Sequence, residues 1–322
     1  MQLSKKAKDV FSLLGRIAVS AAILYFVLSK IDMQKTKEVL SSCDVVFIFY
    51  AFLSFILCNL FLLLRWIIFI RALELKAKML DVFRFFFAGL FGNLFLPTAI
   101  GGDIIKILGL CRNNEEKAKV VASVLLDRLS GYIAIVIVPL VSLAFISDKT
   151  HIVEVVFIAS FLAAALLLFF TVLFSKRVYS FFCQVFNKFP RIKNAMMNLQ
   201  YNISLLGGRK IEGLKAIGLS CLCQVIYAFT FVFLAKALHQ EINLIYFFVF
   251  IPLLCVASVI PSIGGLGPRE WGAAKLFEKI GIINEVAISM SLINFLFMII
   301  VGLAGGLIYV FTLPSRRLQS DK

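Results

Sequence analysis

Six apolar segments constrain this chain more than any other feature, because each is near or above the roughly 20 residues that a helix needs to cross a bilayer. They cover residues 11–29, 44–64, 120–146, 152–174, 214–236 and 286–311. Their apolar residues do not alternate strictly with polar ones, which is typical of helices and not of barrel strands. The sequence therefore predicts an all-α polytopic membrane protein, with a single integral membrane domain over residues 1–322.

Composition agrees with a membrane protein, since 61% of the 322 residues are hydrophobic and only 16% are charged. The basic residues form short clusters between apolar segments, so the net charge of +15 does not indicate a nucleic-acid partner. The first segment lacks a good cleavage site after it, and we expect an uncleaved helix there. Cys221 and Cys223 have no metal-ligand partners nearby in the sequence, so we expect neither a metal nor a cofactor.

Two further apolar segments, 85–100 and 244–263, are interrupted within the stretches LPTAIGGD and IPSIGGLGPRE. The interrupting residues are Pro97, Gly101 and Gly102 in the first, and Pro261, Gly264, Gly265 and Gly267 in the second. Unpaired backbone groups cost several kcal/mol in lipid, so broken helices survive only where protein or water covers them. The breaks therefore predict two re-entrant elements that face an intramembrane cavity, the second followed by a short charged helix over 268–280.

The interrupted segments also indicate an internal repeat. Moving residues 85–100 forward by 164 positions gives 249–264, and the same shift moves 120–146 onto 284–310. Broken segments at matching places in two halves point to a binding site near the middle of the membrane. We therefore expect repeat halves over 1–150 and 151–322, and an odd number of full spans in each half would give them opposite orientations.

Charge counting supports this inverted repeat. If both broken elements turn back, the inside loops hold 22 Lys and Arg residues and the outside loops hold five. The positive-inside rule then places both termini in the cytoplasm, for a multi-pass protein of the cytoplasmic (inner) membrane. The alternative is that 244–263 spans the bilayer outright, which would place the C-terminus outside. We expect the basic, aromatic-rich loop 175–213 to lie in the interface as an amphipathic segment.

Seven polar side chains near the breaks form the candidate substrate site. They are Asn93, Asp103, Lys106, Asp127, Arg128, Arg269 and Glu270. The cations would neutralise a lipid phosphate, and the carboxylates would pair with them in the empty site or carry protons. Each charge deep in a bilayer costs about 2.5–3.5 kcal/mol on insertion scales, so the alternative is structural pairing, for example Asp127 with Arg269 or Lys106 with Glu270. Asn93 would either cap freed backbone or face the cavity.

The stretches GNLFLPTAIGGDIIK, SVLLDRLSGY and IPSIGGLGPRE resemble the signatures of the lysylphosphatidylglycerol synthase transmembrane-region family, also called flippase-like. The resemblance covers roughly residues 10–312 and implies a membrane domain that handles lipids. The resemblance also implies that, in multidomain members, this membrane domain moves aminoacylated phosphatidylglycerol between leaflets. In those members a soluble aminoacyltransferase domain follows it in the chain. The chain ends nine residues after Leu313, so we expect no lysine transfer. Lys106 stands where the family commonly has arginine, which keeps the charge but loses a bidentate grip on phosphate.

These observations predict a lipid transporter, not an enzyme, that shelters the head group of an anionic phospholipid or glycolipid. The absence of a G-x-x-x-x-G-K-[ST] stretch favours an ion-coupled cycle. One alternative is a membrane enzyme acting on lipid phosphates, although His151 and His239, the only histidines, form no phosphatase pattern. Another is an accessory subunit of envelope lipid or polysaccharide assembly. For this protein we expect membrane lipids as partners, together with a separately encoded lipid-modifying or glycosyltransferase enzyme. The sequence indicates no particular oligomeric state.

Overall fold

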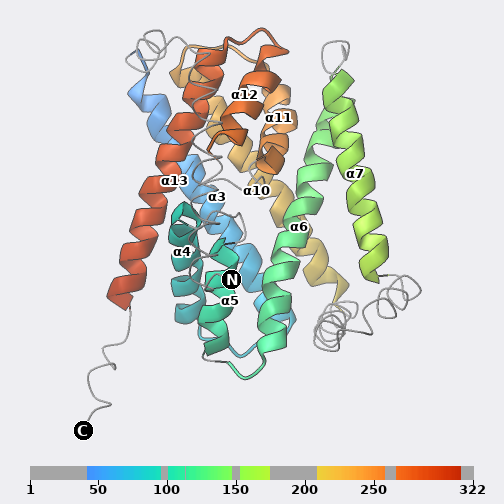
Figure 1. Cartoon of the computed structure of the whole chain (residues 1–322), viewed down its shortest axis with the longest axis vertical. Helices are drawn as coiled ribbons and strands as arrows, with labels where there is room; N and C mark the ends of the chain where they lie inside the picture. Colours follow the sequence, from blue (N-terminus) through green and yellow to red (C-terminus); the bar gives the residue numbers. More distant parts are fainter. Residues whose placement is uncertain are drawn as a thin grey trace, which may run out of the picture.

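The computed structural model describes residues 42–95, 101–112, 114–146, 153–174, 209–257 and 266–312. Within these ranges every regular secondary-structure element is a helix, as the sequence predicts (Figure 1). The helices are α3 (Val45–Ala72), α4 (Met79–Phe95), α5 (Gly101–Arg112), α6 (Lys117–Ala144), α7 (Val153–Phe174), α10 (Lys210–Ala237), α11 (Leu244–Ala257), α12 (Pro268–Glu278) and α13 (Asn284–Thr312). The expected span 11–29, most of the loop 175–213, Pro97, Pro261, Gly264 and Gly265 lie outside the described residues.

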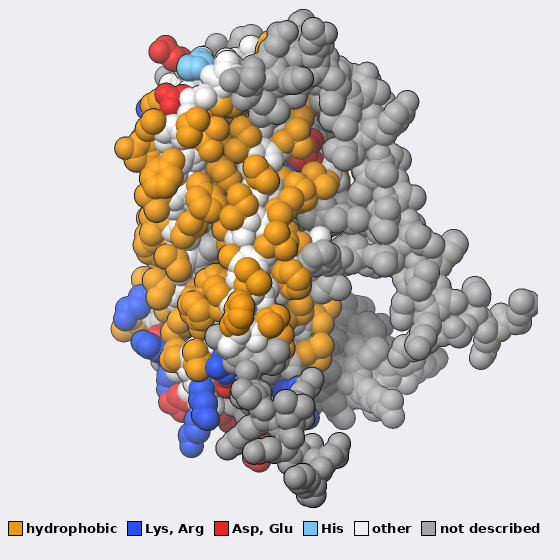
Figure 2. Space-filling view, turned by 90° about the vertical axis from the view of Figure 1, so that its left-hand side faces the viewer, with side chains coloured by type: hydrophobic (Ala, Val, Ile, Leu, Met, Phe, Trp, Pro, Cys, Tyr) orange, Lys and Arg blue, Asp and Glu red, His pale blue; other side chains and the backbone are white. Residues whose placement is uncertain are grey.

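Four of the described helices, α3, α6, α10 and α13, are long and apolar enough to cross a membrane. Each has about 28 residues, and at a rise of about 1.5 Å per residue this gives a length of roughly 42 Å. Large apolar side chains such as Phe49, Leu53 and Leu57 are exposed on the outer face of α3. Figure 2 shows that such side chains form a broad apolar band, with Lys and Arg gathered at its lower end. The chain is therefore a multi-pass membrane protein.

Helix α3 extends well beyond the apolar segment that predicted it. The segment 44–64 continues as α3 to Ala72, so Arg65 lies inside a helix and not in the following loop. Hydropathy falls where a charge appears, whereas an ion pair within the protein allows the helix to continue, and this explains the difference. Helix α6 begins at Lys117, which places Asp127 and Arg128 about three turns inside it.

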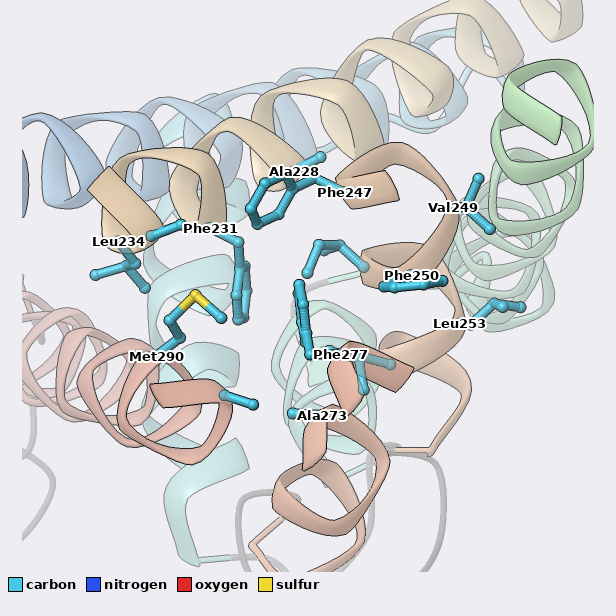
Figure 3. Packing of buried hydrophobic residues seen from close by; sticks show 14 of the residues in the cluster. Ala228, Phe231, Leu234, Phe247, Val249, Phe250, Leu253, Ala273, Phe277 and Met290 are labelled. Carbon is cyan, nitrogen blue, oxygen red and sulfur yellow. The ribbon is translucent and has the colours of Figure 1, made fainter. Parts of the chain in front are cut away.

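The short helices form two antiparallel pairs, α4 with α5 and α11 with α12. In the first pair, Gly89 faces Gly102 so closely that a Cβ atom on Gly102 would lie 2.4 Å from the Gly89 carbonyl oxygen. In the second, the ring of Phe277 lies 5.7 Å from that of Phe247 and 5.5 Å from that of Phe250, in a core that also includes α10 and α13 (Figure 3). Figure 1 shows the α4–α5 pair in the lower half of the bundle and the α11–α12 pair in the upper half.

The order of long helix, short pair and long helix occurs twice. Helices α3, α4, α5 and α6 begin at residues 45, 79, 101 and 117, and α10, α11, α12 and α13 begin at 210, 244, 268 and 284, so corresponding helices are 165, 165, 167 and 167 residues apart. Helices α3 and α10 run antiparallel, because Asp44 contacts Ala237 while Ser54 contacts Ile226. Each short pair also packs on the other set, α4 on α13 and α11 on α6. The two sets of helices therefore interlock.

Glycine on α13 allows α4 to approach closely. A Cβ atom on Gly305 would lie 2.6 Å from the backbone oxygen of Phe87. We expect Gly305→Leu to lower the free energy of unfolding by about 1–3 kcal/mol, because overpacking forces the helices apart. Thermal unfolding in detergent measures this. Gly218→Leu on α10 is the matched control, since a Cβ atom there meets no atom within 4 Å. Equal losses in both variants would contradict this account of the packing.

Candidate functional site

The structure describes all seven predicted site residues and places six of them in two clusters. The α5–α6 cluster consists of Asp103 and Lys106 on α5, Asp127 and Arg128 on α6, and Arg65 on α3. The α12–α13 cluster consists of Arg269 and Glu270 at the start of α12 and Ser291 on α13. Asn93 lies on α4 beside the start of α5.

Asp103, in the first turn of α5, pairs with two cations. The Arg128 Nε atom donates a hydrogen bond to one carboxylate oxygen, and the Lys106 Nζ atom lies 3.4 Å from the other. Asp103 and Lys106 thus lie on one face of α5 as an i,i+3 ion pair. The Lys106 ammonium also lies 5.2 Å from the ring centroid of Trp66 and 5.0 Å from that of Phe86. Cation–π attraction of this kind compensates the lysine for part of its lost hydration.

Asp127 pairs with Arg65, which follows the predicted apolar segment 44–64 and is not among the seven predicted site residues. The Arg65 Nε atom lies 2.6 Å from the Asp127 Oδ1 atom, and both side chains are buried. Arg65 also donates to the Ser220 hydroxyl of α10 at 3.2 Å, so the pair links α3, α6 and α10. The suggested pairing of Asp127 with Arg269 is wrong, because α6 faces α3 at this level. No local pattern could have found the pair, since 62 residues separate its members.

Arg128 is the accessible member of the α5–α6 cluster. Its side chain is 32% exposed, whereas the side chains of the other four members are exposed by 10% or less. The cluster holds three cations and two carboxylates, so it carries one positive charge in excess. A guanidinium has five N–H donors in a planar fork, a geometry that suits charge-assisted hydrogen bonds to carboxylates and phosphates.

Arg269 and Glu270 pair with each other within the α12–α13 cluster. The Arg269 Nη2 atom lies 2.8 Å from the Glu270 Oε1 atom, and the Ser291 hydroxyl donates to the same oxygen at 2.8 Å. The other Glu270 oxygen accepts from the Gly267 N–H at 2.6 Å, as a glutamate at the third helical position commonly does. Lys106 is therefore not the partner of Glu270. Both side chains are enclosed, and their contacts fix the start of α12 against α13.

The described parts of the breaks contain two helix starts. The Asn93 Oδ1 atom accepts from the Gly102 N–H at 2.8 Å, so Asn93 caps α5 and the first of its two expected roles is the one observed. Gly267 has a φ of 92°, a left-handed conformation that favours glycine, and it leads into Pro268 as the first residue of α12. The short helix that the sequence predicts over 268–280 is thus present as Pro268–Glu278.

A cavity of about 670 Å³ opens between α3, α10 and α11. Its wall includes Phe47, Lys236, His239, Glu241 and Asn243, and none of the seven predicted site residues lines it. In the ranges that the structure describes, no three or more His, Cys, Asp and Glu side chains group in a way that could hold a metal ion.

Comparison with known proteins connects this architecture to a family. The UPF0104 membrane protein PH1989 of Pyrococcus horikoshii is 24% identical to this chain, in an alignment that covers 94% of this chain and 97% of that protein. No solved structure matches the chain. The family model of the lysylphosphatidylglycerol synthase transmembrane region matches residues 13–306, and this confirms the resemblance read from the three signature stretches. The chain therefore belongs to the family of the lysylphosphatidylglycerol synthase transmembrane region.

Proposed function

We propose that this protein binds the anionic head group of a membrane lipid inside the bilayer and moves the lipid between leaflets. The observation that carries this proposal is the state of Arg128, a one-third exposed guanidinium in a cluster with one excess positive charge. A charge within a membrane span is costly unless it serves a site or a pair. The chain belongs to a family that is named after the transmembrane region of a lipid synthase, and this supports a role in lipid handling.

In this proposal the α5–α6 cluster is the phosphate site. Arg128 would turn part of its donor fork from Asp103 to the phosphate, and such charge-assisted hydrogen bonds are about twice as strong as neutral ones. Lys106, held over Trp66 and Phe86, would add a second positive charge. The start of α5 adds the partial positive charge of a helix N-terminus. In the empty site, Asp103 holds both cations in place.

The interlocked sets of helices would supply the movement. We interpret α3–α6 and α10–α13 as the cores of two inverted repeat halves, 1–150 and 151–322, with α4–α5 and α11–α12 as re-entrant pairs from opposite faces. The opposite placement of these pairs in Figure 1 and the spacing of 165–167 residues support this interpretation. Rocking of one repeat against the other around a central site is a common way to alternate access.

The basic end of the bundle would face the cytoplasm by the positive-inside rule. In a cysteine-free background of the protein in intact cells, we expect Ser4→Cys, Asn114→Cys and Ser320→Cys to react only with a membrane-permeant thiol reagent. Gln240→Cys, in the turn between α10 and α11, should react with an impermeant reagent added outside. External labelling at position 320 would show that the second pair does not turn back, and the inverted repeat would have to be abandoned.

Native mass spectrometry of the purified protein tests the lipid proposal. We expect phosphatidylglycerol to be retained more strongly than phosphatidylcholine of the same chains, because the excess charge of the α5–α6 cluster favours an anion. Equal retention of both lipids would contradict the proposal. The same spectra also test the two alternative functions, a membrane enzyme and an accessory subunit. A lipid-converting enzyme would change the mass of the added lipid. An accessory subunit would need a separately encoded lipid-modifying or glycosyltransferase enzyme before either lipid is retained.

A further inference from the structure

The cavity between α3, α10 and α11 has the size and the lining of a ligand site. Its volume of about 670 Å³ lies within the roughly 300–1,000 Å³ of pockets that bind small molecules. It lies at the end of the bundle where α10 turns into α11, which is the end that we expect outside. Its wall combines the apolar side chains of Phe47, Val232 and Phe247 with polar side chains from the turn between α10 and α11.

The opposite end of the α3–α10 pair shows why this space is open. The turn after α3 contains Glu74 and the turn after α10 contains its equivalent His239, and both residues have a positive φ, of 52° and 56°. The Arg209 guanidinium contacts Glu74 and a carbonyl oxygen in the last turn of α3. At the cavity end the equivalent of Arg209 is Asp44, whose carboxylate instead accepts from a backbone N–H of its own helix at 2.9 Å. A long side chain therefore fills one end of the pair, whereas a short one leaves the other end open.

Two opposite charges line this cavity without pairing with each other. Lys236 and Glu241 both belong to its wall, and neither forms an ion pair with any residue that the structure describes. The Lys236 ammonium lies 5.8 Å from the ring centroid of Phe47, which also lines the cavity, so cation–π attraction keeps the charge at the wall. A simple anion would meet the carboxylate of Glu241, and a simple cation would meet Lys236. A ligand with one anionic and one cationic group complements both charges.

Two amides in the wall add a hydrogen-bond acceptor and a donor to these charges. The Gln240 Nε2 atom donates to a backbone carbonyl at the end of α10 at 3.2 Å, and its amide oxygen is the atom that can accept from a ligand. The Asn243 Oδ1 atom accepts from a backbone N–H at the start of α11 at 3.1 Å, and its amide nitrogen is the atom that can donate. A primary ammonium has N–H groups for both Glu241 and Gln240, whereas a quaternary ammonium has none.

We infer that this cavity binds a zwitterionic phosphoethanolamine group. The ammonium lies against Glu241 and Gln240, and the phosphate lies against Lys236 and Asn243, because lysine binds phosphate as a compact charge. The volume and the apolar wall suit the phosphoethanolamine group together with the first carbons of lipid chains better than a small free zwitterion. This site is separate from the α5–α6 cluster and does not depend on the proposed function, since the ligand is held here and is not the lipid that the protein moves.

Native mass spectrometry of the purified full chain tests the inference with two zwitterionic lipids of the same chains. We expect phosphatidylethanolamine to bind about tenfold more tightly than phosphatidylcholine, a typical effect of a hydrogen bond to a charged group. Soluble glycerophosphoethanolamine carries the same group without chains, and we expect it to bind at least tenfold more weakly than the lipid. Binding as tight as that of the lipid would identify the soluble ester as the source of the group at this site.

Two substitutions separate the roles of the charges. We expect Glu241→Gln to reduce the ratio of phosphatidylethanolamine to phosphatidylcholine affinity at least fivefold, because the ammonium loses its charged acceptor. Lys236→Gln should weaken both lipids alike, since both carry the phosphate. The matched controls are Lys275→Gln and Glu278→Gln, which change an exposed ion pair on α12 that does not line the cavity. These controls should keep the wild-type affinities.

Each outcome bears on the cavity alone. Equal wild-type affinities for phosphatidylethanolamine and phosphatidylcholine would overturn the inference, and so would a wild-type ratio in Glu241→Gln. Equal effects of Glu241→Gln and Glu278→Gln would mean that surface charge in general, and not this cavity, selects the lipid. None of these results changes the expected retention of phosphatidylglycerol, which depends on Arg128, so failure of the inference and failure of the proposed function are distinguishable.

Discussion

Replacement of Arg128 by glutamine is expected to weaken binding of phosphatidylglycerol about 30-fold while the protein still inserts and folds. A hydrogen bond to a charged group contributes about 1.5–3 kcal/mol, and Arg128 would make such bonds to the phosphate. The change also removes the excess positive charge of the α5–α6 cluster, and Asp103 keeps Lys106 as its partner. Native mass spectrometry of the purified variant with graded amounts of lipid measures the loss.

The matched control for this change is Arg112→Gln. Arg112 lies in the last turn of α5, the helix that carries Asp103 and Lys106, and its side chain is exposed. We expect this control to bind phosphatidylglycerol within about twofold of the wild type, since exposed pairs contribute little. Equal losses in the two variants would mean that general basic charge, and not the position of Arg128, attracts the lipid.

Replacement of Arg65 by leucine is expected to lower the free energy of unfolding by about 3–5 kcal/mol, because it leaves a buried carboxylate without its partner. Asp127 and Arg65 are each exposed by 8% or less, so water cannot take over the lost contact. The measurement is the unfolding transition in detergent, followed by loss of tertiary structure and of helix signal. The effect should appear with or without lipid, in contrast to that of Arg128→Gln.

The double variant Arg65→Leu/Asp127→Leu provides the control for the pair. Removing both charges of a buried ion pair costs far less than removing one, and well-packed apolar replacements can even stabilise a protein. We therefore expect the double variant to recover most of the stability lost in Arg65→Leu. A double variant as unstable as the single one would show that the side chain of Arg65 matters for its packing and not for its charge.

The sequence predicts the helical class, the two interrupted segments and the approximate repeat, because each depends on local composition. The offset of 164 residues read from the Pro and Gly patterns differs by at most three from the spacings of the helices. The start of α12 at Pro268 follows from the fixed φ of proline and the preceding glycine.

The partners of the charged residues could not be predicted, because they depend on how distant helices cross. Arg65 was missed because hydropathy treats a charge as the end of an apolar segment. From the sequence alone, Arg128 and Arg269 are equal candidates for binding a phosphate. In the structure, Arg128 has a substantially exposed side chain and Arg269 has a buried one.

Transport of phosphatidylglycerol between leaflets in proteoliposomes tests the central claim most directly. A fluorescent phosphatidylglycerol placed in both leaflets can be bleached from outside, and the fraction that becomes accessible reports its movement. We expect vesicles with the wild-type protein to lose nearly all of the fluorescence, and vesicles with Arg128→Gln to lose only the outer half, as empty vesicles do. Wild-type vesicles that behave like empty ones, with the protein folded and inserted and an ion gradient imposed in either direction, would contradict the account.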